Sequence, residues 1–133
     1  MDPASKFLFH PIFVHFPIAF YFLELLLLAF WAWRGKFVYH RFAVFSFWLG
    51  YLFMIASIVT GLIDSGGFNR MGEATRAHFY MAGAVFIFYT ARTVYLRFAN
   101  AQDRYHAMIQ ISGSVIGNIL VVLTAYFGGK LVY

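Results

Sequence analysis

Five histidines are the side chains of this chain best suited to bind a metal: His10, His15, His40, His78 and His106. Four of them stand near the start of an apolar segment, one in each segment. The chain has no cysteine, which excludes disulfides, thiolate zinc sites and iron–sulfur clusters. No nucleophile–base pair, phosphate loop or pair of carboxylates accompanies the histidines, so a hydrolase or a kinase is not indicated. The residue types predict a metal or haem site.

The segments that must position these histidines are long and apolar. Hydrophobic residues make up 62% of the 133 residues and charged residues 11%, whereas a soluble domain has about 25% charged residues. Four runs of about 20 residues or more, each enough to cross roughly 30 Å of hydrocarbon, cover residues 12–33, 39–63, 75–96 and 106–131. Short connections make neighbouring helices antiparallel. The sequence predicts one all-α domain over residues 1–133, an integral membrane up-down-up-down four-helix bundle.

Basic residues indicate how this bundle is oriented. One end carries Arg34, Lys36, Arg41, Arg97 and Arg104, while the end with the termini has a more even balance of basic and acidic residues. Since basic loops stay in the cytoplasm, we expect both termini on the outer side. The net charge of +5 is spread thinly between apolar runs, so we expect contact with lipid and no nucleic acid.

The antiparallel arrangement predicts two histidine pairs. His15 and His78 share a depth near the outer face, and His40 and His106 share a depth near the inner face. Each pair comes from diagonal helices of the bundle. A haem b bound between two imidazoles needs such a pair. His10 is an alternative to His15 as outer ligand, and a three-histidine zinc site is a further alternative.

Helical phase predicts the surroundings of each pair. Gly113, Gly117 and Gly128 fall on the face of His106, where small residues either admit a flat macrocycle or pack helices closely. The face of His78 continues through Ala82, Val85, Tyr89 and Arg92. Arg76, two residues before His78, is a candidate partner for the propionates of an outer haem.

Glu24 is an acidic residue in the middle of the first apolar run. It follows His15 by nine residues, about 180° around a helix. If His15 points inward, Glu24 faces lipid or another protein, and an unpaired carboxylate in lipid is costly. The sequence therefore predicts a partner subunit or a homo-oligomer at this face. The alternative is a protonated, neutral Glu24 that is tolerated among the leucines.

Several motifs resemble one family. The ten residues from His10 to Ala19 fit HPxxVHFPIA, residues Thr60 to Asp64 fit TGxxD, and Gly128 to Tyr133 fit GGxLVY. Together with a histidine at position 78, they resemble an uncharacterised bacterial family of four-helix membrane proteins, domain of unknown function 2231, over nearly the whole chain. The resemblance implies a bacterial protein with His10, His15 and His78 as motif residues. In a bacterial inner membrane, the outer side expected for the termini from the basic residues is the periplasm. Such domains also occur joined to c-type cytochromes, which supports electron transfer by association.

These observations predict a non-catalytic, b-type cytochrome-like electron-transfer subunit. His15 and His78 would bind one haem b, and His40 and His106 a second. Electrons would pass between a periplasmic carrier, such as cytochrome c, and quinone or a partner complex. The alternative is a cofactor-free membrane anchor or assembly subunit whose histidines join helices by hydrogen bonds. A metal or proton transporter is disfavoured because few polar residues line any path.

Overall fold

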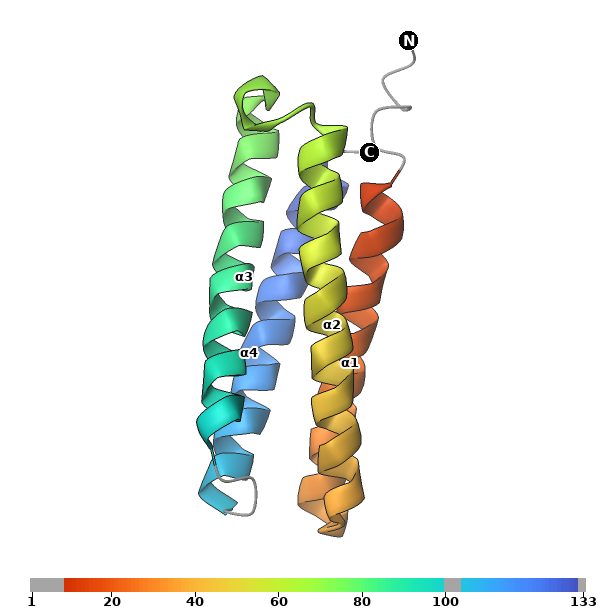
Figure 1. The fold of residues 1–133 in the computed structure, drawn as a ribbon, viewed down its shortest axis with the longest axis vertical. Coiled ribbons are helices and arrows are strands. Elements are labelled where there is room, and N and C mark those ends of the chain that lie inside the picture. The colour runs from red at the N-terminus through yellow and green to blue at the C-terminus, as the bar shows by residue number, and fades with distance from the viewer. Residues whose placement is uncertain (1–8, 100–103, 132–133) are drawn as a thin grey trace.

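The computed structural model describes residues 9–99 and 104–131, and this part of the chain forms four long helices. They are α1 (His10–Arg34), α2 (Phe37–Asp64), α3 (Glu73–Phe98) and α4 (Arg104–Gly129), and a short 3-10 helix η2 (Phe68–Arg70) precedes α3. Neighbouring helices run antiparallel, so α1 begins and α4 ends at the same end of the bundle (Figure 1). The predicted all-α four-helix membrane bundle is confirmed, and each helix extends beyond its expected range at one or both ends.

Local chemistry explains where the helices begin and end. Pro11 occupies the first turn of α1, where its missing N–H is not needed. Gly35 ends α1 in a left-handed conformation, with φ of 68°, and donates its N–H to the Trp31 carbonyl. Gly66 and Gly67, with φ of 73° and 96°, turn the chain from α2 toward α3.

The outer surface of the bundle is apolar. In the described part of the chain, four helices are long and apolar enough to cross a membrane. Large hydrophobic side chains on all of them are exposed, among them Phe42, Ile87 and Val122 at 57%, 70% and 59%. Exposed apolar area on this scale needs a lipid solvent, because water would disfavour it. The chain is therefore a multi-pass membrane protein in contact with the bilayer.

The helices lie in the cyclic order α1, α2, α3, α4, which places α1 diagonally across from α3. The α1–α2 pair packs closely, whereas α2 and α3 touch at few points. Tyr21 of α1 and Tyr89 of α3 meet at the centre, where their rings stack with centroids 3.8 Å apart. Both rings are fully buried, and Phe47 of α2 completes the core. Aromatic contacts across the diagonal therefore hold the bundle centre together.

The structure corrects the predicted inner face of α1. The buried residues of this helix are Pro17, Tyr21, Glu24 and Leu28, while His15 is exposed. The prediction that Glu24 faces lipid or a partner is wrong, because its phase was counted from His15. His10 is the inward histidine, and Glu24 follows it by fourteen residues, close to four turns of about 3.6 residues.

Glu24 instead forms an ion pair inside the bundle. Its carboxylate accepts hydrogen bonds from Arg92 of α3 at 2.6 and 3.1 Å, and from the hydroxyl of Ser114 on α4 at 3.2 Å. The predicted inward face of α3, through Val85, Tyr89 and Arg92, is confirmed. This network joins three helices at mid-depth, where lipid offers no counter-ion.

Candidate histidine site

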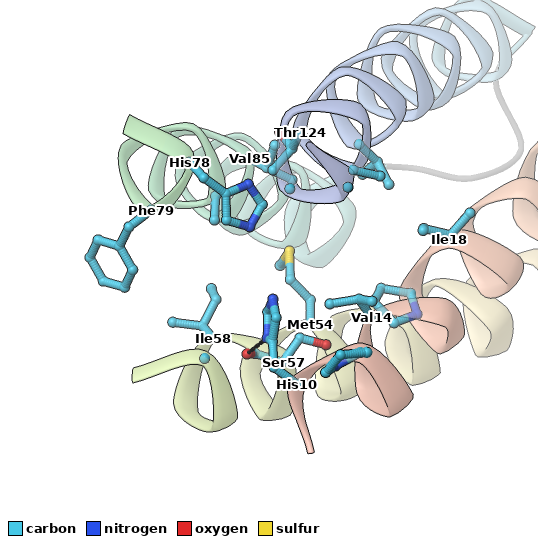
Figure 2. A pocket seen from close by; sticks show the side chains of 18 of the residues that line it. His10, Val14, Ile18, Met54, Ser57, Ile58, His78, Phe79, Val85 and Thr124 are labelled. Atoms are coloured by element: carbon cyan, nitrogen blue, oxygen red, sulfur yellow. Dashed lines mark hydrogen bonds between the residues drawn. The ribbon is translucent and has the colours of Figure 1, made fainter. Parts of the chain in front are cut away.

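A cavity of about 340 Å³ lies at the end of the bundle where α1 begins and α4 ends. All four helices line it, and the wall is mostly apolar, with contributions from Val14, Ile18, Met54, Ile58, Val85 and Val121. Figure 2 shows His10 from α1 and His78 from α3 directed toward one another across this space. The two histidines are therefore polar groups placed on opposite sides of an apolar chamber.

The imidazoles of His10 and His78 are close neighbours although 68 residues separate them. Their ring centroids lie 6.1 Å apart and their planes are inclined at 74°. His10 Nδ1 lies 2.7 Å from the carbonyl oxygen of Ser57 on α2. A carbonyl can only accept, so Nδ1 carries the proton. In the neutral ring, Nε2 of His10 then has a free lone pair, as a metal ligand requires.

His78 is only partly satisfied by the protein. Its Nδ1 atom is buried and has no hydrogen-bond partner among the described residues, although the ring lies beside the backbone of Thr124. A buried polar atom without a partner costs free energy unless something else binds it. This ring is therefore available to a ligand.

Two glycines make room for the two imidazoles. A Cβ atom at Gly61 of α2 would lie 3.0 Å from His10 Nδ1, and a Cβ at Gly128 of α4 would lie 2.7 Å from His78 Cε1. Any larger side chain would displace the ring beside it. Each histidine therefore packs against helix backbone on one side, which fixes its position.

Asp64 positions the start of α1. Its Oδ2 atom accepts hydrogen bonds from the backbone N–H groups of His10 at 2.9 Å and Phe9 at 3.3 Å. The first N–H groups of a helix have no partner within the helix, and an anion stabilises that end. The motif residues Gly61, Asp64, His78 and Gly128 thus converge on the region around His10.

His15 does not join this pair. It is exposed at the edge of the cavity, and its Nδ1 donates to the Pro11 carbonyl one turn earlier at 2.5 Å. Of the two open alternatives, the structure brings His10 and not His15 next to His78. Arg76 is also exposed, and its guanidinium lies over the Phe68 ring, 5.4 Å from the ring centroid.

The two inner histidines have separate partners. His40 Nε2 lies 3.1 Å from Gln110 Oε1 of α4, whereas His106 Nδ1 is hydrogen-bonded to the hydroxyl of Tyr95 on α3. The contacts of the described residues do not bring His40 and His106 together. The arrangement expected for a second haem is therefore not formed in this part of the chain.

The predicted glycine stripe is divided between the core and the cavity: Gly128 lines the cavity, whereas Gly113 and Gly117 pack against the core. A Cβ at Gly113 would lie 3.2 Å from Arg92 Nε, and Gly117 lies against the Tyr89 hydroxyl. Neither glycine is among the described residues that line the cavity. Gly113 and Gly117 let α4 approach the ion pair and the tyrosine stack, which is helix-packing chemistry.

Three described histidines line the cavity, but only the imidazoles of His10 and His78 lie next to each other. Among residues 9–99 and 104–131, no three His, Cys, Asp or Glu side chains are grouped as a metal ion would require. The three-histidine zinc site is therefore not formed by these residues. Two nitrogen donors suit a metal whose remaining ligands come from a macrocycle.

Sequence comparison identifies the chain's relatives. No curated protein and no solved structure matches the chain. The family described as "Predicted membrane protein (DUF2231)" matches residues 7–133, which confirms the family predicted from the motifs. The protein with this diagonal histidine pair belongs to the DUF2231 family of predicted membrane proteins.

Proposed function

We propose that this protein is a b-type cytochrome-like electron-transfer subunit that binds one haem b between His10 and His78. The observation that carries the proposal is the 6.1 Å separation of the two imidazole centroids across the α1–α3 diagonal. An ion bound at about 2 Å by a nitrogen from each of two facing imidazoles separates their centroids by roughly 6 Å. The pair therefore has a spacing compatible with two axial ligands.

The surroundings of the pair support this assignment. Histidines that bind metals usually donate their second ring N–H to a carbonyl or carboxylate, as His10 does to Ser57. The buried Nδ1 of His78 lacks a partner among the described residues, and Gly61 and Gly128 leave space for the rings. The apolar wall suits a porphyrin, whose iron supplies one-electron chemistry when bound.

The position of the cavity favours an electron donor or acceptor on the side of the termini. The cavity lies at the α1 start, where the described basic residues are accompanied by the acidic Asp64 and Glu73. The opposite end has no described acidic residue, and its basic residues include Arg34, Lys36, Arg41 and Arg97. Positive-inside logic then favours a histidine pair on the periplasmic side of a bacterial inner membrane. A carrier such as cytochrome c would exchange electrons there, with quinone or a partner complex as the second partner.

The alternative function, a cofactor-free anchor or assembly subunit, also has an observation in its favour. The Glu24–Arg92–Ser114 network ties three helices together by side chains alone. The His40–Gln110 hydrogen bond joins two helices in the same way. A bundle with such internal links has a stable core without a cofactor.

An optical spectrum separates the two functions. The protein is purified in a mild detergent from cells supplied with haem precursor, and absorbance is recorded before and after reduction with dithionite. Haem binding predicts a Soret band and a sharp α band on reduction, with one haem per chain in a pyridine assay. A featureless spectrum would reject haem binding and favour the anchor.

The glycine beside His78 gives a second test. In the Gly128→Ala variant, the new Cβ would lie 2.7 Å from His78 Cε1 and displace the ring. Over-packing costs about 1–3 kcal/mol, so we expect haem affinity to fall roughly 5- to 150-fold. Haem content per chain, measured during stepwise removal of haem by a competing apoprotein, reports this change.

Gly83→Ala is the matched control for that variant. It makes the same substitution on α3 at a residue outside the described cavity lining, where a Cβ would have no described atom within 4 Å. Haem content should then equal that of the unmodified chain. Equal haem retention by both variants would show that the contact between Gly128 and His78 is unrelated to binding.

A further inference from the structure

A second cavity lies at the opposite end of the bundle from the histidine pair. Its volume is about 190 Å³, and α2, α3 and α4 contribute to it. The lining residues are His40, Val44, Trp48, Leu96, Arg97, Ala99 and Gln110. The volume is below the roughly 300–1,000 Å³ of sites for drug-sized ligands, so a small polar group fits better than a macrocycle.

The inner wall of this cavity is polar and rigidly held. His40 and Gln110 are 5% and 4% exposed and lie 3.1 Å apart. The Trp31 and Phe37 rings contact His40, with centroids at 4.6 and 5.1 Å. The carboxamide oxygen of Gln110 accepts from His40, which leaves the amide NH2 of Gln110 with donors to offer a ligand.

The outer wall is basic. Arg97 lines the cavity from the last turn of α3. Arg34, Lys36 and Arg41 are exposed at the same end of the bundle. The acidic side chains that the structure describes lie at mid-depth or at the other end, at positions 24, 64 and 73. The cavity therefore attracts an anion more strongly than a neutral molecule such as a quinone.

The remaining wall of the cavity is apolar and lies near the lipid-facing surface of the bundle. Val44 and Leu96 are partly buried, and Trp48 is 46% exposed on the apolar surface of α2. Few contacts join α2 and α3, which flank this opening. An occupant with an anionic head and an acyl tail would place its head beside Arg97 and its tail along Trp48.

We propose that this cavity binds the phosphodiester headgroup of an anionic phospholipid. Arg97 supplies the planar donor set that matches phosphate oxygens, and Gln110 supplies neutral donors. Basic pockets between transmembrane helices bind anionic headgroups in this way. The proposal is independent of haem binding, since it uses none of the residues around His10 and His78.

Native mass spectrometry in a non-ionic detergent tests the proposal. The full chain is titrated with phosphatidylglycerol and, separately, with phosphatidylcholine of the same acyl chains. We expect one phosphatidylglycerol per chain to bind about tenfold more tightly than phosphatidylcholine, because phosphatidylcholine has the same phosphodiester but also a choline cation, which the Arg97 guanidinium repels. Equal affinities for the two lipids would overturn the proposal.

Two arginine variants distinguish binding at this cavity from general electrostatic attraction to the basic end of the bundle. Arg97→Gln should remove the preference for phosphatidylglycerol. Arg34→Gln removes the same charge at the same end of the bundle, but Arg34 lies over the Trp33 ring, 4.5 Å from its centroid, and does not line the cavity among the described residues. It should keep the preference. Equal losses in both variants would show diffuse attraction in place of a site.

A third variant and two competitors complete the test. Gln110→Leu keeps every charge and should lower phosphatidylglycerol affinity severalfold, so the proposal stays testable if Arg97→Gln does not fold. Millimolar inorganic phosphate should not displace the lipid, because it has no tail. Displacement by phosphate would identify a soluble anion as the ligand, and displacement by a short-chain quinone would identify a quinone site. Either result would overturn the lipid assignment.

Discussion

The Glu24→Leu variant is expected to lose about 3–5 kcal/mol of the free energy of unfolding, the usual cost of breaking a buried ion pair. Glu24 and Arg92 are 2% and 9% exposed, and two hydrogen bonds join them. Without the carboxylate, the guanidinium stays charged inside the bundle, because arginine does not lose its proton in proteins. Titration with sodium dodecyl sulfate, followed by helical circular dichroism and tryptophan fluorescence, measures the loss.

The reverse substitution should be milder. In Arg92→Met, the stranded carboxyl group of Glu24 can bind a proton and keep its contact with Ser114. The double variant Glu24→Leu, Arg92→Met should recover most of the loss, because apolar side chains of similar volume replace the whole pair. We expect a large loss of stability in Glu24→Leu, a smaller loss in Arg92→Met and a near-complete recovery in the double variant. This combination is expected only if the two side chains form a buried pair between α1 and α3.

Glu73→Gln is the control for these variants. Glu73 is an exposed carboxylate in the first turn of α3, and its removal should change stability by no more than about 0.5 kcal/mol. If Glu24→Leu were no more harmful than Glu73→Gln, the ion pair would make no contribution to stability. Additive losses in the double variant would likewise contradict the proposed coupling.

The fold could be predicted because its signal is spread over many residues. Each of α1 to α4 is 25 residues or longer, and a membrane requires roughly 20 apolar residues per crossing. Single substitutions barely alter such a pattern. The short connections then determine the antiparallel order, and with it the diagonal relation of α1 and α3. The four-helix bundle thus follows from length and hydropathy alone.

The inward face of α1 could not be read in the same way. Residues of both faces are apolar, because one face contacts lipid and the other the core. Hydropathy therefore does not show which side of α1 faces the core. The predicted position of Glu24 depended instead on whether His10 or His15 was assumed to point inward. The polar residues carry the missing signal: His10 and Glu24 lie on one face, and that face excludes His15. A mid-membrane acid is a better marker of the inner face than a histidine near the interface.

The hydrogen-bond partners of individual side chains could not be predicted from the sequence either. His40 and His106 were predicted to share a depth, but hydrogen bonding also depends on rotation about each helix axis by a few tens of degrees. His40 turned toward Gln110, and His106 toward Tyr95. Gly61 was likewise predicted only as a motif residue, and Gly128 only as a motif residue and part of a glycine stripe on the face of His106, although each makes room for an imidazole of the outer pair. Their role depends on the neighbouring helix, which no single segment reveals.

The largest effect on the proposed haem is expected from the two paired histidines. His78→Ala removes one axial ligand and should abolish the reduced α band, because no other described histidine lies beside His10 in its place. His10→Ala should do the same, and it also frees the Ser57 carbonyl. Both variants keep the apolar wall of the cavity. Haem content and reduced-minus-oxidised spectra, measured on equal amounts of folded protein, report the outcome.

The His15→Ala variant tests whether haem binding requires His10 in particular or only a sufficient number of histidines in this region. It deletes an imidazole five residues from His10, but one that is exposed and bonded to its own helix at Pro11. Full haem content in His15→Ala, together with none in His10→Ala, would match the geometry of the α1–α3 diagonal. Loss of haem in His15→Ala with full haem content in His10→Ala would identify His15 as the axial ligand. It would also require α1 to be rotated by about half a turn, which would expose Glu24. The stability of the Glu24→Leu variant would then be near that of the unmodified chain, so the two sets of measurements constrain one another.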